Sequence, residues 1–216
     1  MKLATQFLIV ASLGLAAMPM QAGTIFSENF DELAPQLAVS SAGQFTAING
    51  TNVDIVAASN GWGFLVVPPE SGNVVDLGGS GGNPFGQLES NPITLAAGTY
   101  TLSFDLVGSQ RGLTTSTLVT LGTSGAPTSL YDQSFTLLSN GYAGTGGVVT
   151  ALFTVPSSET VYLNFTDTSD PSTYNIGSLL DNVEISTIPE PSSLLLLGTG
   201  LTALAGLARR RFGRSA

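Results

Sequence analysis

Apolar and polar residues alternate along many short segments in the middle of the chain. In residues 99–107, Tyr100, Leu102, Phe104 and Leu106 alternate with mostly polar residues, which predicts a strand with one buried face. Similar short runs cover residues 24–30, 44–48, 53–57, 62–67, 73–77, 86–89, 93–95, 117–121, 130–137, 148–155, 160–166 and 179–186. Residues 31–43 lack this pattern and are expected to form a loop.

Turn-forming residues separate these runs. Asn49-Gly50 and Asn60-Gly61 are typical of tight turns, and Pro68-Pro69 ends a predicted strand. No amphipathic helix pattern appears between the two ends of the chain. Many short strands with Gly, Asn and Ser between them predict an all-β fold, an antiparallel β-sandwich, over residues 23–187.

The N-terminal segment differs from this pattern. Lys2 precedes an uncharged apolar run over residues 3–17, and Ala22 supplies a small residue for cleavage. This order predicts a secretory signal peptide, a helix over residues 1–22 that is removed after Ala22. An uncleaved anchor is the alternative, which the shortness of the run and Pro19 disfavour.

The C-terminal segment, residues 188–216, combines three different features. Pro189-Glu190-Pro191 stops the preceding strand, and residues 192–208 form an uncharged apolar run, about 25 Å long as a helix. This length is near the lower limit for a transmembrane helix. Four arginines over residues 209–214 follow, namely Arg209, Arg210, Arg211 and Arg214. They favour the cytoplasmic side, so the preceding residues are expected to lie outside the cytoplasm.

These features in this order resemble the PEP-CTERM sorting domain of Gram-negative bacteria. The resemblance implies that a membrane protease of the exosortase type recognises Pro189, Glu190 and Pro191 and removes the helix. It further implies an inner-membrane-anchored precursor that becomes a protein of the cell surface or extracellular matrix. The alternative is a permanent single-pass anchor that is never cleaved.

The composition of the middle region limits its chemistry. Of 15 acidic residues only Glu190 lies outside residues 23–188, and of six basic residues only Arg111 lies inside, which leaves a net charge of −13. Such a charge disfavours nucleic-acid binding. The chain has no Cys and no His, which excludes Ser-His-Asp and Cys-His catalysis and the usual structural zinc sites.

Three segments resemble extracellular jelly-roll domains of the galactose-binding-like and carbohydrate-binding kinds. They are Val-Asp-Leu-Gly-Gly at 75–79, the strand and turn at 98–112, and Leu-Leu-Asp-Asn-Val-Glu-Ile at 179–185. The resemblance implies a structural Ca²⁺ held by Glu28 and Asp181. Six to eight oxygens are needed, so backbone carbonyls and Asp31 or Asn29 would have to contribute. Alternatively, Asp181 caps a turn or accepts hydrogen bonds from backbone amides.

Other polar or aromatic residues are candidates for ligand contact. Asp167, Asp170 and Tyr174 lie in a polar loop between the last two strands, and the alternative is a solvated loop. Trp62 is the single tryptophan, which could stack on a sugar ring or lie in the core. Arg111 is expected to pair with a carboxylate, with contact to a ligand as the alternative, and Asp76 is expected to brace a loop.

We therefore expect an exported, non-enzymatic domain with a structural or polysaccharide-binding role. A secreted hydrolase that uses two carboxylates is the alternative, since two acids suffice for glycoside hydrolysis. A permanently membrane-anchored surface domain is the other.

Overall fold

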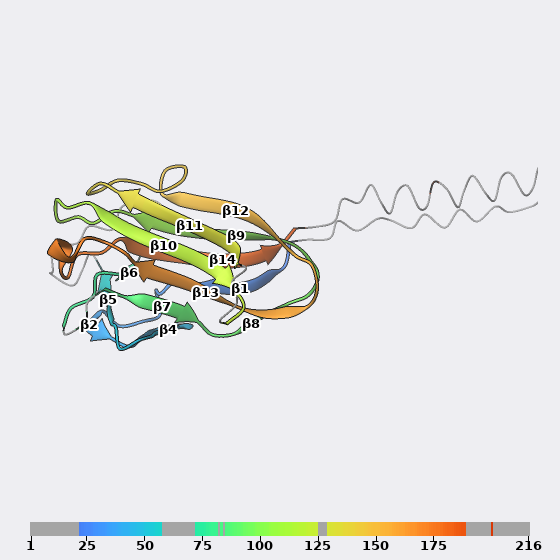
Figure 1. Cartoon of the computed structure of the whole chain (residues 1–216), viewed down its shortest axis with the longest axis horizontal. Coiled ribbons are helices and arrows are strands. Elements are labelled where there is room, and N and C mark those ends of the chain that lie inside the picture. The colour runs from blue at the N-terminus through green and yellow to red at the C-terminus, as the bar shows by residue number, and fades with distance from the viewer. Residues whose placement is uncertain are drawn as a thin grey trace, which may run out of the picture. The chain divides into compact units, whose positions relative to one another are not determined.

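The domain is a sandwich of two antiparallel β-sheets (Figure 1). The computed structural model describes residues 22–57, 72–81, 83, 85–124, 129–188 and 200. Within it, Ala22–Ile188 forms one compact unit. Its strands are β1 (Thr24–Glu28), β2 (Gln36–Val39), β3 (Ser41–Ala42), β4 (Phe45–Ala47), β5 (Val53–Ala57), β6 (Asn73–Asp76), β7 (Gln87–Ser90), β8 (Ile93–Leu95), β9 (Gly98–Val107), β10 (Thr115–Gly122), β11 (Ser129–Leu137), β12 (Val148–Val155), β13 (Glu159–Asp167) and β14 (Leu179–Thr187), with a 3₁₀ turn, η2 (Pro171–Thr173).

The chain passes several times from one sheet to the other. Among the described residues, the first sheet has the order β12-β9-β14-β6-β5-β2, with β1 also paired to β14. The second has the order β11-β10-β13-β7-β4-β3, with β8 also paired to β13. Thr187 donates its backbone N–H to the carbonyl of Gly23 (2.9 Å), so the two ends of this unit lie together. The turn η2 lies at the opposite end of the sandwich (Figure 1).

The core forms where the alternating residues of both sheets meet. In β9, the predicted inward residues Tyr100, Leu102, Phe104 and Leu106 are buried, which confirms the buried face. Phenylalanine rings continue this core between the sheets: Phe104 meets Phe165 edge-on with centroids 5.2 Å apart, and Phe165 meets Phe45 at 5.9 Å. Such edge-to-face pairs add to the stability that apolar burial already provides.

The prediction of a loop over residues 31–43 is wrong, because this segment contains β2 and β3. The two strands lack alternation for physical reasons. β2 is mostly exposed, its pairing with β5 shifts register, and Ala38 has a positive φ of 53°. β3 has only two residues. Neither strand could therefore produce a periodic hydrophobic pattern.

Several predictions concern residues outside the described part. They are the signal peptide before Ala22, the strand over residues 62–67 and the sorting segment from Pro189 onward, apart from Gly200. Among the described residues, none belongs to a helix with the length and hydropathy that crossing a bilayer requires.

Candidate functional site

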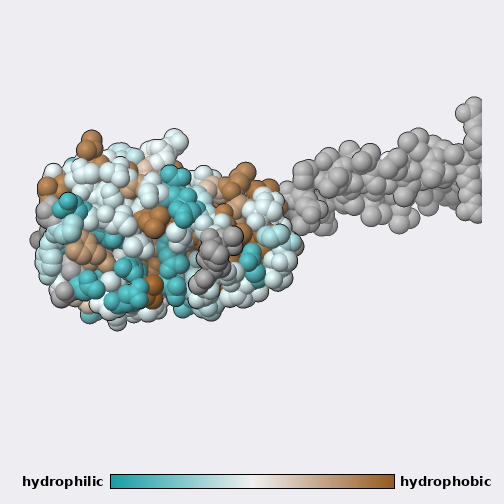
Figure 2. Space-filling view, in the orientation of Figure 1, coloured by the Kyte–Doolittle hydropathy of each residue, from teal (hydrophilic) through white to brown (hydrophobic). Residues whose placement is uncertain are grey.

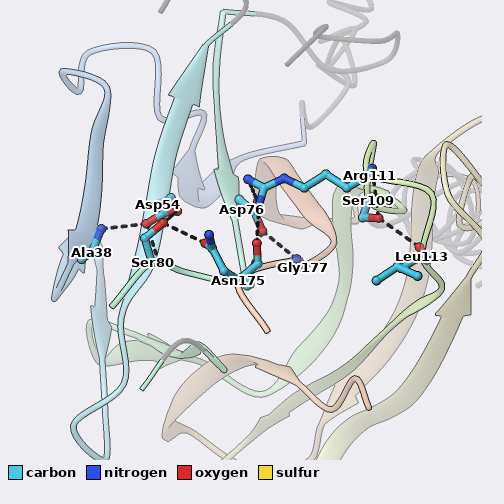
Figure 3. Close-up of polar contacts among 10 residues, drawn as sticks. Ala38, Asp54, Asp76, Ser80, Ser109, Arg111, Leu113, Asn175 and Gly177 are labelled. Atoms are coloured by element: carbon cyan, nitrogen blue, oxygen red, sulfur yellow. Dashed lines mark hydrogen bonds and ion pairs between the residues drawn. The ribbon is translucent and has the colours of Figure 1, made fainter. Parts of the chain in front are cut away.

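Three loops meet over the outer face of the first sheet and form what we call the loop cluster, residues 77–81, 108–114 and 171–178. Figure 3 shows the row of polar contacts that joins them to β5 and β6. Asp54 of β5 accepts hydrogen bonds from the backbone N–H of Ala38 (2.7 Å) and of Ser80 (2.9 Å). The Ser80 hydroxyl donates to the same carboxylate and lies 2.8 Å from the side-chain oxygen of Asn175. A fully buried aspartate thus anchors a glycine-rich loop.

Asp76 and Arg111 form the second part of the cluster (Figure 3). Asp76 accepts hydrogen bonds from the backbone N–H of Gly78 (2.8 Å) and of Gly177 (2.9 Å). Its other oxygen lies 3.7 Å from Nη2 of Arg111, whose Nη1 donates to the carbonyl of Asn175. Burial raises the pKa of Asp76 to about 7, although both amides and Arg111 act in the opposite direction. The expected pairing of Arg111 with a carboxylate and bracing by Asp76 are confirmed.

The loops approach each other so closely that glycine is required. A Cβ atom on Gly177 would lie 1.9 Å from the backbone nitrogen of Gly78. Loop 108–114 is in turn joined to residues 138–141, because Gly108 donates to the carbonyl of Gly141 and Asn140 to that of Ser109, both at 2.8 Å. Hydrogen bonds between backbones therefore hold this end of the domain in one arrangement.

Two tyrosines present their rings to solvent at these loops. Tyr174 is 55 % exposed, and its hydroxyl donates to the carbonyl of Gly81 (2.6 Å). Tyr142 is 47 % exposed and bridges to Val107, at the start of loop 108–114. Arg111 is about one-third exposed and donates to the carbonyl of Asn175, the residue that follows Tyr174. Rigid aromatic side chains with Arg, Ser, Gly and Asn around them are typical of binding surfaces.

The predicted ligand residues of the polar loop do not all face solvent. Asp170 and Tyr174 are exposed, whereas Asp167 is buried and lies on the same side of β13 as Phe165. Burial raises the pKa of Asp167 to about 6, while Ser169 lowers it. This position removes Asp167 from the ligand-facing residues. Trp62 lies outside the described residues.

Glu28 and Asp181 lie on the neighbouring strands β1 and β14, with Glu28 opposite Val183. Glu28 accepts hydrogen bonds from the backbone N–H of Phe30 (3.0 Å) and of Gln44 (2.8 Å). It lines a pocket of about 350 Å³ together with Ser27, Asn29, Asn182, Val183 and Glu184. Asp181 is wholly buried and accepts the backbone N–H of Asn182 (2.7 Å).

The donor set of this region suits a hard cation only in part. The pocket is rich in oxygen atoms, which Ca²⁺ prefers. Within the described ranges, however, no group of three or more Asp, Glu, His or Cys residues is placed to hold a metal ion. Asp181 is not among the residues that line the pocket, so backbone and amide oxygens would have to complete any coordination shell around Glu28.

Sequence reasoning missed the partnership of Asp54, Ser80 and Asn175. These residues are far apart in the chain, and only the fold brings them together. The glycine-rich run 78–82 was the available signal, since a loop without side chains allows other backbones to approach closely.

A model of the PEP-CTERM protein-sorting motif matches residues 187–211. The chain carries a PEP-CTERM sorting motif. It is therefore an exported protein, as the terminal residues predicted. No curated protein sequence matches the chain.

Solved structures with a similar fold include carbohydrate-binding modules. The CBM22-1 xylan-binding domain of Xyn10C from Paenibacillus barcinonensis is 12 % identical, with a TM-score of 0.52 over 78 % of this chain and 97 % of that one. The K1 cleaved adhesin domain of Lys-gingipain from Porphyromonas gingivalis W83 is 17 % identical, with a TM-score of 0.48 over 77 % and 99 %. At such identities the first likeness establishes the fold alone, a jelly-roll β-sandwich.

Proposed function

We propose that the sandwich is a non-catalytic domain that binds a neutral polysaccharide at the loop cluster. The observation that carries this proposal is the exposed ring of Tyr174 on a loop that buried carboxylates hold in place. A second exposed ring, Tyr142, lies on the segment that backbone hydrogen bonds join to loop 108–114. An aromatic face can stack on the apolar face of a sugar ring, and the surrounding Ser, Asn and Arg side chains can bond its hydroxyl groups.

The charge of the domain favours a neutral ligand. A net charge of −13 over residues 23–188 repels polymers rich in uronic acids or sulfate groups. The face in Figure 2 is mostly pale, with separate hydrophilic and hydrophobic patches. The similarity to a xylan-binding domain supports the proposal at the level of fold.

The environment of the two aspartates that anchor the loop cluster, Asp54 and Asp76, favours binding over hydrolysis there. Asp54 and Asp76 are buried and accept hydrogen bonds from backbone amides, so neither is available to a polymer in solution. A carboxylate-dependent hydrolase is the competing function. It would need an accessible pair of acids on either side of a glycosidic bond.

Calorimetric titration of the purified full chain with xylan, a neutral glucan and polygalacturonate tests the proposal. We expect binding of a neutral polymer, weakened about tenfold in Tyr174→Ala, which corresponds to about 1.4 kcal/mol. Tyr162→Ala, a half-buried tyrosine on the outer face of β13, is the matched control. Loss of binding only in Tyr162→Ala would place the site on the second sheet. Release of reducing sugar would instead support the hydrolase.

We also infer that an exosortase-type protease processes the exported chain at Pro189–Pro191, after the helix over residues 192–208 has held it in the inner membrane. Only one residue, Ile188, separates β14 from the first proline of the motif. The intact mass of the surface-exposed protein decides between processing and permanent anchorage. A mass that still includes residues 192–216 would contradict processing.

Glu28 and Asp181 remain candidates for a structural Ca²⁺ site. The oxygen-rich pocket at Glu28 supports this proposal, and the hydrogen bond from Asn182 to Asp181 supports a purely structural role instead.

A further inference from the structure

The strand β12 differs from the other strands that stand first or last in the strand order of each sheet. Among the described residues these strands are β12 and β2 in one sheet and β11 and β3 in the other. β2 and β3 are short, and β11 carries Asp132 and a register shift in its pairing. β12 has eight residues in unbroken register with β9. Short, irregular or charged edges resist pairing with other chains, whereas long regular ones favour it.

The sequence of β12 contains nothing that would prevent such pairing. Its residues, Val-Val-Thr-Ala-Leu-Phe-Thr-Val, include no charge and no proline. Leu152 is 68 % exposed, and Val148, Thr150 and Thr154 beside it are also exposed. An exposed leucine in the middle of an uncharged edge stands out in a domain with a net charge of −13.

Hydrogen bonds at the start of β12 show which backbone groups face outward. The Gly147 carbonyl accepts from Leu106 of β9 (2.9 Å), whereas Val148 exchanges bonds with Thr145 (3.0 and 3.3 Å), away from β9. Backbone groups alternate in direction along a strand. Thr150, Leu152 and Thr154 therefore direct their N–H and C=O groups to the open edge.

The open stretch of this edge is limited on both sides. Val148 is already bonded to Thr145, and the next outward position after Thr154 is Pro156, which has no N–H. Only one antiparallel register with a copy of the same strand uses all three outward residues. It places Leu152 opposite Leu152, and Thr150 opposite Thr154.

We propose that β12 pairs antiparallel with β12 of a second copy of this chain, about a twofold axis at Leu152. In this register paired residues lie on the same face of the joined sheet, so the two exposed leucines cover each other. The absence of charge in β12 lets two strongly acidic domains approach along this edge. The pairing joins two sandwiches through one continuous sheet.

Single-cysteine cross-linking of the purified full chain in detergent tests this pairing. The chain has no cysteine, so a disulfide in Leu152→Cys can form only between two copies. Opposite residues in this register have Cα atoms about 5.5 Å apart, within the range that a disulfide bridges. Leu138→Cys is the matched control, because Leu138 is 73 % exposed but lies outside the strands.

We expect Leu152→Cys to oxidise to dimer on the order of tenfold faster than Leu138→Cys, since pairing raises the local thiol concentration. Thr150→Cys mixed with Thr154→Cys should cross-link, whereas each alone should do so no faster than the control. Equal rates for Leu152→Cys and Leu138→Cys would overturn the proposal. A change to Leu152→Lys that weakens polysaccharide binding without altering association would assign the edge to the ligand and would also overturn it.

Discussion

Two pairs of aspartates lie directly opposite each other on the first sheet, and they are stabilised in different ways. Asp54 faces Asp76 between β5 and β6, and Asp105 faces Asp181 between β9 and β14. All four side chains are at most 5 % exposed. Like charges in opposite positions destabilise a sheet, so each pair requires compensating contacts.

The first pair has a cation within reach. Asp54 bonds Ser80 and Ala38, and Asp76 bonds two loop amides and lies beside Arg111. In the second pair, the side-chain amide of Asn182 donates to both Asp105 (2.7 Å) and Asp181 (3.2 Å). The second pair adjoins the region where Ca²⁺ is proposed. A bound metal ion would compensate the negative charge of Asp181, as Arg111 compensates that of Asp76.

Asp76 should have the largest effect on stability, through pH. Because burial raises its pKa from 3.8 to about 7, its ionisation opposes folding. The contribution of Asp76 to the free energy of unfolding is fully favourable below about pH 4. It is lost as the pH rises to about 7, which lowers the free energy of unfolding by about 4 kcal/mol in total. Urea unfolding followed by circular dichroism should show that Asp76→Asn removes this part of the pH dependence.

The matched control for this experiment is Asp132→Asn, which removes an exposed carboxylate from β11. It removes one negative charge, as Asp76→Asn does, but from an exposed position. If Asp76→Asn and wild type lose stability equally between pH 4 and pH 8, burial of Asp76 does not govern the first pair.

Calcium provides the next largest test, on the second pair. If Ca²⁺ binds at Glu28 and Asp181, a concentration one hundred times Kd stabilises the fold by about 2.7 kcal/mol, or roughly 5–11 °C in Tm. The shift between Ca²⁺ and EDTA should disappear in Asp181→Asn and persist in Asp54→Asn. A Tm that is the same in Ca²⁺ and EDTA would contradict a Ca²⁺ site at Glu28 and Asp181.

The sequence predicted the sandwich because its central strands have one buried face, as in β9, where the residue pattern reports burial directly. It could not predict β2, whose exposed residues carry no such pattern. In the loop cluster, the pairing of Arg111 with a carboxylate followed from its being the single cation of the domain. The burial of Asp167 and the contacts of Asp54 depend on neighbours distant in the chain, so local residue types did not reveal them.

Substitution of Asn182 by glycine should have the smallest effect on the free energy of unfolding, because it removes both a backbone strain and two hydrogen bonds. Its φ of 49° is strained for a side chain, so Asn182→Gly relieves the backbone while it removes the amide between Asp105 and Asp181. Loss of these hydrogen bonds costs about 1–2 kcal/mol, and the backbone relief offsets part of it. We therefore expect a net loss below about 1 kcal/mol. Asn182→Ala keeps the strain and loses the amide, so urea unfolding should find it less stable than Asn182→Gly. The reverse order would mean that the positive φ at this position stores no strain. An Asn182→Ala variant as stable as wild type would mean that Asn182 does not hold the second pair together.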